Sequence, residues 1–210
     1  MSSGQGRSAV MEHLEIPVEE TTNMAAFKKI GKGEFQTELP DSNDMQMWGI
    51  IYIGSDKQPM SVMMDTGSPW VWSSAKSCTT CPGKYTFDSS TSTTFKAPGG
   101  WNDKNLGYGS GIAKGPVVHD TWCIGNDKAG ASCYKNMKFV NAKSTTLSIL
   151  KCSGLIGLSP MPSSSGATDL FIDKMKEAGI IDKKIFSFSI GMGAYKNQMT
   201  FGGYDVAKFG

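Results

Sequence analysis

The stretch Ser61-Val-Met-Met-Asp-Thr-Gly-Ser-Pro-Trp-Val-Trp-Ser-Ser74 decides how the rest of the chain is interpreted. An apolar run ends at Asp65, and the next three residues supply a tight turn and two hydroxyl groups. The apolar run then restarts with two tryptophans. Asp, Gly and Ser are common in ordinary surface turns, but such a turn seldom needs apolar segments on both sides. The pattern predicts a buried strand that delivers one carboxylate to a hydroxyl-lined turn.

These residues resemble the first active-site segment of the pepsin-like aspartic proteases. The family pattern is two apolar residues, then Asp-Thr-Gly-Ser, then a tryptophan four residues beyond the serine, where Trp72 stands. The resemblance implies that Asp65 is a catalytic carboxylate. It also implies that hydroxyl groups hold this carboxylate by hydrogen bonds while a glycine lets the backbone approach it. The supporting residues would be Thr66, Gly67 and Ser68.

A second informative stretch is Leu106-Gly-Tyr-Gly-Ser-Gly-Ile-Ala-Lys-Gly115. Its glycines do not fit a phosphate-binding loop, because Lys114 stands where Gly-x-Gly-x-x-Gly needs its third glycine. The stretch predicts a mobile β-hairpin and resembles the family's flap, a hairpin that closes over the cleft and excludes water. In the family, the flap tyrosine bonds the indole N–H of the tryptophan that matches Trp72. The flap residues would be Tyr108, Gly109, Ser110 and Gly111.

A third segment, Cys152-Ser-Gly-Leu-Ile-Gly-Leu158, resembles the family strand that passes close behind the catalytic turn. Gly157 would permit that close approach. The resemblance implies that Leu155 lines the substrate cleft together with Trp72. The family usually has Asp-Gly where this chain has Ser153 and a glycine.

Five cysteines leave one unpaired, or paired outside the chain. Cys78 and Cys81 suit a disulfide, a redox pair or half of a zinc site, whereas the spacing of Cys123 and Cys133 matches zinc ligands poorly. The family commonly has a small disulfide loop about this far beyond its catalytic Asp. We therefore expect disulfides Cys78–Cys81 and Cys123–Cys133, no metal and no cofactor, with Cys152 left over.

Short strands and turns dominate the rest of the pattern, as 25 glycines suggest. The sequence predicts a surface loop at 86–105, a helical turn at Lys28 and Lys29, and one helix at 167–178 with an apolar face, closed by Gly179. Fold class is therefore all-β with one or two short helices, and the resemblance makes it a pepsin-like lobe of the double-psi barrel type. Strands are expected at 14–18, 46–54, 59–64, 117–124, 137–142, 186–190 and 199–203.

The 210 residues suit one domain with a sizeable core. We interpret 45–210 as the N-terminal lobe of such a protease. Residues 1–44 are then an N-terminal extension, either the remnant of a zymogen prosegment or a flexible leader. Asp65 is the only Asp followed by Thr-Gly or Ser-Gly, so the C-terminal lobe with the second catalytic Asp is expected to be absent from this sequence.

The composition and charge of the chain limit the kinds of partner that it is expected to bind. A net charge of +2 leaves no footprint for nucleic acid, and no apolar stretch approaches the ~18 residues that span a bilayer. No signal peptide is visible at the N-terminus. Members of the family usually enter the secretory pathway, so the resemblance implies a lysosomal, vacuolar or extracellular location.

The function implied is an aspartic endopeptidase that hydrolyses polypeptides by water attack between two carboxylates, one of them Asp65. The chain alone would then be an inactive half of the enzyme. Pro69 stands where the family usually has a small hydroxyl residue, and proline removes an N–H. This departure and the single lobe favour an alternative, a catalytically inactive pepsin-like protein that binds peptides. A homodimer in which two copies of Asp65 meet is a third reading.

Overall fold

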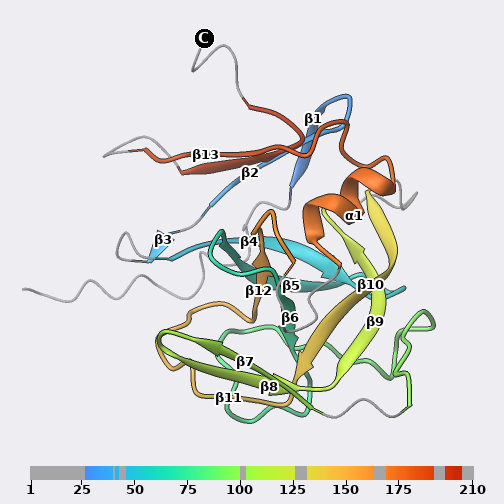
Figure 1. The fold of residues 1–210 in the computed structure, drawn as a ribbon, viewed down its shortest axis with the longest axis vertical. Helices are drawn as coiled ribbons and strands as arrows, with labels where there is room; N and C mark the ends of the chain where they lie inside the picture. Colours follow the sequence, from blue (N-terminus) through green and yellow to red (C-terminus); the bar gives the residue numbers. More distant parts are fainter. Residues whose placement is uncertain are drawn as a thin grey trace, which may run out of the picture.

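Six strands close into a barrel that carries Asp65 at the end of one of them (Figure 1). The computed structural model describes residues 27–39, 41–42, 46–99, 103–125, 132–162, 169–191 and 197–204. Around the barrel the strand order is β4-β5-β12-β6-β10-β9, and β9 pairs again with β4. The strands are β4 (Gln46–Ile53), β5 (Gln58–Asp65), β6 (Val71–Ser74), β9 (Val117–Cys123), β10 (Cys133–Ala142) and β12 (Gly154–Gly157), with β3 (Asp41–Ser42) added beside β4.

The barrel contains two interlocked crossings. Strands β5 and β6 follow one another in sequence, yet β12 lies between them, parallel to β5 and antiparallel to β6. Strand β6 in turn lies between β10 and β12. A strand inserted between two connected neighbours is a ψ-shaped crossing, so the two together confirm the double-psi barrel expected from the sequence. Strand β12 is buried along its whole length, as its run of small and apolar residues requires.

A four-stranded sheet joins the two ends of the described chain. Its order is β1 (Lys28–Gly31), β2 (Glu34–Glu38), β14 (Gln198–Phe201) and β13 (Phe186–Ser189). The expected helical turn at Lys28 and Lys29 is therefore wrong, because both residues lie in a strand that pairs with β2. The rings of Phe27 and Phe201 lie 4.8 Å apart in the core. Folded structure thus begins before residue 45; an origin of residues 1–44 in a prosegment stays a prediction.

Helix α1 (Phe171–Glu177) packs against β10 (Figure 1) and is shorter than the sequence predicted. Phe171 and Met175, one turn apart, are its buried residues, and Ala178, the last residue of the predicted helix, is exposed. Gly179 ends the helix with a φ of 68°, a value that favours glycine. Residues 163–168 of the predicted helix lie outside the described part of the chain.

The predicted hairpin is present as a separate small sheet. Strands β7 (Lys104–Tyr108) and β8 (Gly111–Gly115) pair from Tyr108 opposite Gly111, and β11 (Ser144–Thr145) pairs with the other edge of β8. The strand expected at 14–18 lies outside the described residues. The loop predicted at 86–105 is slightly too long at its end, because β7 begins at Lys104.

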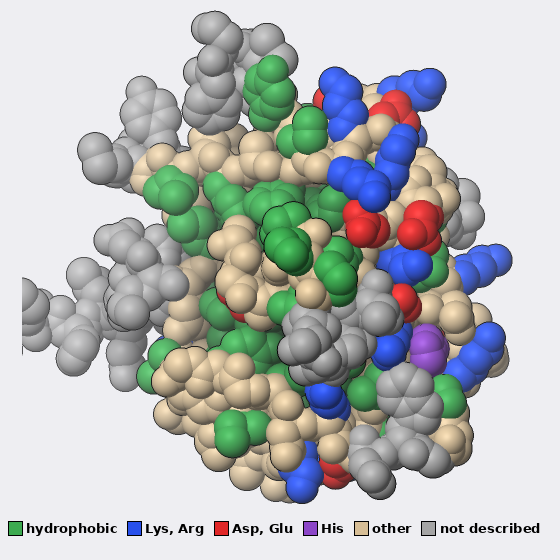
Figure 2. Space-filling view, viewed as in Figure 1, with side chains coloured by type: hydrophobic (Ala, Val, Ile, Leu, Met, Phe, Trp, Pro, Cys, Tyr) green, Lys and Arg blue, Asp and Glu red, His purple; other side chains and the backbone are tan. Residues whose placement is uncertain are grey.

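The surface divides by composition (Figure 2). Lysines and acidic residues gather near helix α1, whereas hydrophobic side chains gather beside the four-stranded sheet. Strand β13 of this sheet carries half-buried Phe186 and Phe188, and Ile190 just beyond the strand is 68% exposed. None of the described helices is long and apolar enough to cross a membrane.

Candidate active site

Asp65 is held at the end of β5 by the turn that follows it. Its Oδ1 accepts a hydrogen bond from the Gly67 N–H at 2.9 Å, and its Oδ2 accepts one from the Ser68 hydroxyl at 2.5 Å. A Cβ on Gly67 would stand 3.2 Å from Oδ1, so glycine permits this close approach. The expected hydrogen bond from Thr66 is not found within the described chain, and Thr66 is exposed. The site thus holds a half-exposed carboxylate in one pose.

The end of strand β12 and the two residues after it support this turn from behind. The Leu158 N–H donates to the Asp65 carbonyl at 2.7 Å, and the Ser159 N–H donates to the Ser68 carbonyl at 3.1 Å. A Cβ on Gly157 would lie 2.5 Å from the Ser68 carbonyl oxygen, closer than real atoms approach. The predicted close passage of Gly157 is therefore present. Pro69 has no backbone N–H, but the turn loses no hydrogen bond because of this. The turn contacts the segment behind it through the carbonyl groups of residues near Pro69, which accept hydrogen bonds.

The hairpin β7–β8 is anchored along one edge. Ile112 exchanges hydrogen bonds with Thr146, and its carbonyl also accepts from the Thr145 hydroxyl at 2.9 Å. Gly111, with a φ of 154°, packs so closely on Thr146 that a Cβ would lie 2.7 Å from the threonine hydroxyl. Gly109 has nothing within 4 Å of such a Cβ. The backbone at Gly109 is therefore uncrowded, whereas Gly111 serves a close contact.

Tyr108 brings a phenol from the hairpin tip to the Asp65 turn. Burial raises its pKa, the negative charge of Asp65 raises it further, and the nearby side chains of Ser68 and Trp72 oppose the shift. The expected bond between Tyr108 and Trp72 does not reach hydrogen-bond geometry in the described chain, although the two groups lie near enough for Trp72 to lower the pKa of Tyr108. The buried Tyr108 hydroxyl and the buried Trp72 indole N–H thus lack a fully formed hydrogen bond within the described residues.

An apolar pocket of about 170 Å³ opens beside Asp65, since Met63, two residues earlier on β5, lines it. Leu155 also lines this pocket, and its place in a substrate cleft stays a prediction. Trp72 does not line the pocket: it is fully buried and packs behind it with Trp70 and Leu155. The motifs did not reveal most of the wall, although the apolar spacing of Leu147 and Leu150 was a signal for it. The lining residues are Gln46, Met63, Tyr108, Ser110, Leu147, Ile149, Leu150 and Leu155.

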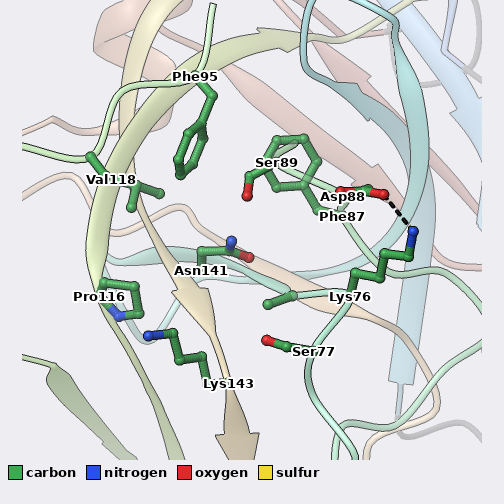
Figure 3. A pocket seen from close by; sticks show the side chains of 12 residues that line it. Lys76, Ser77, Phe87, Asp88, Ser89, Phe95, Pro116, Val118, Asn141 and Lys143 are labelled. Atoms are coloured by element: carbon green, nitrogen blue, oxygen red, sulfur yellow. Dashed lines mark hydrogen bonds and ion pairs between the residues drawn. The ribbon is translucent and has the colours of Figure 1, made fainter. Parts of the chain in front are cut away.

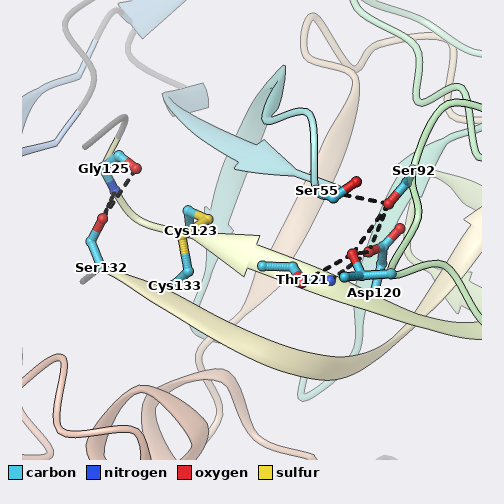
Figure 4. The surroundings of a disulfide bond; sticks show 9 residues. Ser55, Ser92, Asp120, Thr121, Cys123, Gly125, Ser132 and Cys133 are labelled. Carbon is cyan, nitrogen blue, oxygen red and sulfur yellow. Dashed lines mark hydrogen bonds between the residues drawn. A yellow bond between two sulfur atoms is a disulfide. The ribbon is translucent and has the colours of Figure 1, made fainter. Parts of the chain in front are cut away.

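Both predicted disulfides are present, Cys78–Cys81 and Cys123–Cys133. The second joins β9 to β10 beside the Gly125–Ser132 hydrogen bonds (Figure 4). Cys152 is free and buried; burial raises the pKa of its thiol to about 12, and the thiol donates to the Gly154 carbonyl. Among the described residues no group of three or more His, Cys, Asp or Glu side chains is placed to hold a metal ion.

Comparison with known proteins gives one family. The model for eukaryotic aspartyl proteases matches residues 46–210. The chain is 29% identical over 179 residues to embryonic pepsinogen from Gallus gallus and 28% identical over 180 residues to cathepsin D from Dictyostelium discoideum. It is 31% identical over 172 residues to vacuolar protease A from Arthroderma otae. These alignments cover 81%, 81% and 78% of this chain but only 44%, 45% and 42% of the relatives, so the chain spans less than half their length.

Proposed function

The chain belongs to the eukaryotic aspartyl protease family, and on this premise we propose that it supplies the Asp65 half of an aspartic endopeptidase site. The observation that carries the proposal is the pose of Asp65. Each carboxylate oxygen accepts one hydrogen bond, and the group remains open to solvent. A carboxylate held in this way can act on a bound water molecule without first reorganising its surroundings.

The reaction needs a second carboxylate opposite Asp65. Two close like charges cannot both ionise at low cost, so one stays protonated, as is known for aspartic proteases. The ionised carboxylate takes a proton from water, whose oxygen attacks the peptide carbonyl carbon. The protonated one donates its proton to the carbonyl oxygen. When the C–N bond breaks, the carboxyl group that took the proton from water gives it to the leaving nitrogen, and the other carboxylate recovers a proton from the diol as the product carbonyl group forms. We propose that another lobe of the protein supplies the second group.

The substrate is proposed to be an extended polypeptide with an apolar side chain next to the cleaved bond. Six of the eight residues that line the pocket beside Asp65 are apolar or aromatic, and none is charged. Burial of an apolar side chain there is favourable at about 25 cal/mol per Å² of surface removed from water. The tip at Tyr108 would close over the bound peptide.

The proposed location is an acidic compartment of the secretory pathway, the lysosome, the vacuole or the cell exterior. One carboxyl of the pair must stay protonated, which acid pH favours. The relative from Arthroderma otae is a vacuolar protease by name. The two disulfides also suit an oxidising compartment.

The alternative of an inactive peptide-binding protein rested partly on Pro69. The backbone bonds on either side of Pro69 are intact, and Asp65 keeps both of its own. These contacts support the catalytic proposal over the alternative.

The decisive experiment measures the cleavage of an unfolded substrate protein over a range of acid pH values. Two proteins are compared: the longest protein that the gene encodes and the 210-residue chain alone. We expect acid-dependent, pepstatin-sensitive cleavage by the former only. Asp65→Asn should lower the rate by at least about a thousandfold, whereas Asp182→Asn, an exposed control, should leave it unchanged. Peptide binding without cleavage would instead favour the inactive alternative, and activity from a dimer of the short chain would favour the homodimer.

A further inference from the structure

A second cavity lies at the end of the barrel away from the Asp65 turn. Strands β6 and β10 are parallel, so both end on the same side, and the chain enters β6 from the Asp65 turn. The cavity opens where they end, between Ala75 and Asn141, and has a volume of about 480 Å³. This volume is within the usual range for small-molecule sites. We call it the distal pocket (Figure 3); none of its lining residues belongs to the turn, the hairpin tip or the apolar pocket described above.

The walls of the distal pocket are mainly apolar. Phe87 and Val118 are each 1% exposed, and the rings of Phe87 and Phe95 lie 6.1 Å apart. Pro116 and Ala75 complete this wall. A surface of this kind favours an aromatic or branched aliphatic group over a strongly hydrated one such as a phosphate.

One polar group stands unpaired within these walls. Asn141 is 6% exposed, its carboxamide makes no hydrogen bond with any described residue, and its Oδ1 is buried. Figure 3 shows the carboxamide at the centre of the ring of lining residues. Buried amides are nearly always hydrogen-bonded, so this one calls for a partner. A ligand oxygen could accept from its NH₂ group, and a ligand donor could reach the oxygen.

The rim carries one excess positive charge. Lys76 is paired with Asp88 at 2.6 Å. Lys143, on another side of the pocket in Figure 3, makes no ion pair with the described residues and is exposed. An unneutralised ammonium group at the mouth of an apolar pocket favours a ligand with a single negative charge.

We propose that the distal pocket binds a small apolar carboxylate, with the apolar group between Phe87, Phe95 and Val118 and the carboxylate between Asn141 and Lys143. The carboxylate accepts hydrogen bonds from the Asn141 NH₂ group and from the Lys143 ammonium group, while the Asn141 Oδ1, an acceptor, takes its bond from a water molecule in the pocket. This site is independent of the chemistry at Asp65, so its occupancy can be measured without any cleavage assay.

The test uses the 210-residue chain and three probes: phenylacetate, its neutral analogue phenylacetamide, and inorganic phosphate. Binding is followed by the NMR signals of the Asn141 side chain and by calorimetry. We expect phenylacetate to bind saturably at one site, phenylacetamide about two- to fivefold more weakly, as for loss of an exposed ion pair, and phosphate not to bind.

Two variants locate the site. Lys143→Gln should weaken phenylacetate binding about two- to fivefold and leave phenylacetamide unchanged, whereas Lys183→Gln, an exposed lysine elsewhere, should change neither. Asn141→Leu should weaken both probes about fivefold. Absence of saturable binding, equal phenylacetate affinity in wild type and Lys143→Gln, or shifts confined to Leu155 and its neighbours would each overturn the proposal.

Discussion

Asp65 and Asp120 are both followed by threonine and both accept hydroxyl hydrogen bonds, but the fold surrounds them differently. Asp65 is half exposed, with one bond to each oxygen. Asp120 in β9 is fully buried, and the hydrogen bonds that its side chain accepts from described residues all end on Oδ1 (Figure 4). The donors are the Ser92 hydroxyl at 3.1 Å, the Thr94 hydroxyl at 2.5 Å and the Thr121 N–H at 2.7 Å.

Solvent access, rather than the hydroxyl donors, separates these two carboxylates. Water reaches Asp65, so its proton can be exchanged during a reaction. Asp120 has an Oδ2 with no partner among the described residues and no exposed surface, and its bonds tie the 92–94 loop to the barrel. This contrast supports the proposed role of Asp65 in chemistry and indicates a stabilising role for Asp120. Of the four predictions that follow, the first compares the two carboxylates directly, and the others concern the surroundings of Asp65 and a third carboxylate.

The largest effect is expected for Asp120→Ala. This change leaves three donors without their acceptor, and we expect the free energy of unfolding to fall by about 3 kcal/mol. The matched change Asp65→Ala should cost about 1 kcal/mol or less, because water can replace its two bonds. Urea denaturation of the 210-residue chain measures both. Equal losses at the two positions would remove the distinction.

Gly157→Ala tests the support behind Asp65. The added methyl group would lie 2.5 Å from backbone atoms of Ser68 and Pro69. Overpacking of this kind should lower the free energy of unfolding by about 2 kcal/mol. Gly109→Ala is the control, since nothing lies within 4 Å of its Cβ position and a change within about 0.5 kcal/mol is expected. A neutral Gly157→Ala would mean that the turn is looser than these contacts imply.

Tyr108→Phe removes a buried hydroxyl near Asp65 that has no fully formed hydrogen bond with the described residues. Because a buried hydroxyl without a partner is costly, we expect the variant to be more stable by up to about 1 kcal/mol. Tyr204→Phe, at an exposed tyrosine, should leave stability unchanged. Thermal and urea unfolding of both variants provide the measurement. A less stable Tyr108→Phe would show that the hydroxyl is bonded in solution, for example through water.

The smallest effect concerns Asp88, a third carboxylate, which is half-buried. A hydrogen bond from Lys76, with further bonds from Ser90, lowers its pKa from 3.8 to about 2. A lowered folded-state pKa stabilises the fold above the unfolded value, and this contribution is lost as pH falls from about 4 to about 2. The pair should thus survive mildly acidic conditions.

The pH dependence of unfolding measures this contribution. Wild type and Lys76→Met should converge in stability as pH falls through this window, and Lys183→Gln should run parallel to wild type. A constant difference between wild type and Lys76→Met down to pH 2 would show that the carboxyl of Asp88 is not involved.

Much of the site could be predicted because its residues are close in sequence. Asp65, Gly67 and Ser68 lie within one turn, whose backbone brings the donors to the carboxylate whatever surrounds it. The hairpin at Tyr108 and the two short disulfide loops are local in the same sense. Which hydroxyl bonds Asp65 was beyond the motif, since Thr66 and Ser68 have the same chemistry and only the path of the turn separates them.

The sequence by itself determined the elements with local patterns: the strand that ends at Asp65, the glycine hairpin, the tight turn and the pairing of neighbouring cysteines. Only the tertiary structure decided that Lys28 and Lys29 lie in a strand, that β2 pairs with β14 through contacts such as Gln36 to Thr200, 164 residues apart, and that Asn141 stands in a pocket. The physical reason is range: a turn is stabilised by its own bonds, whereas strand pairing and burial depend on distant groups whose combined contacts outweigh local preference.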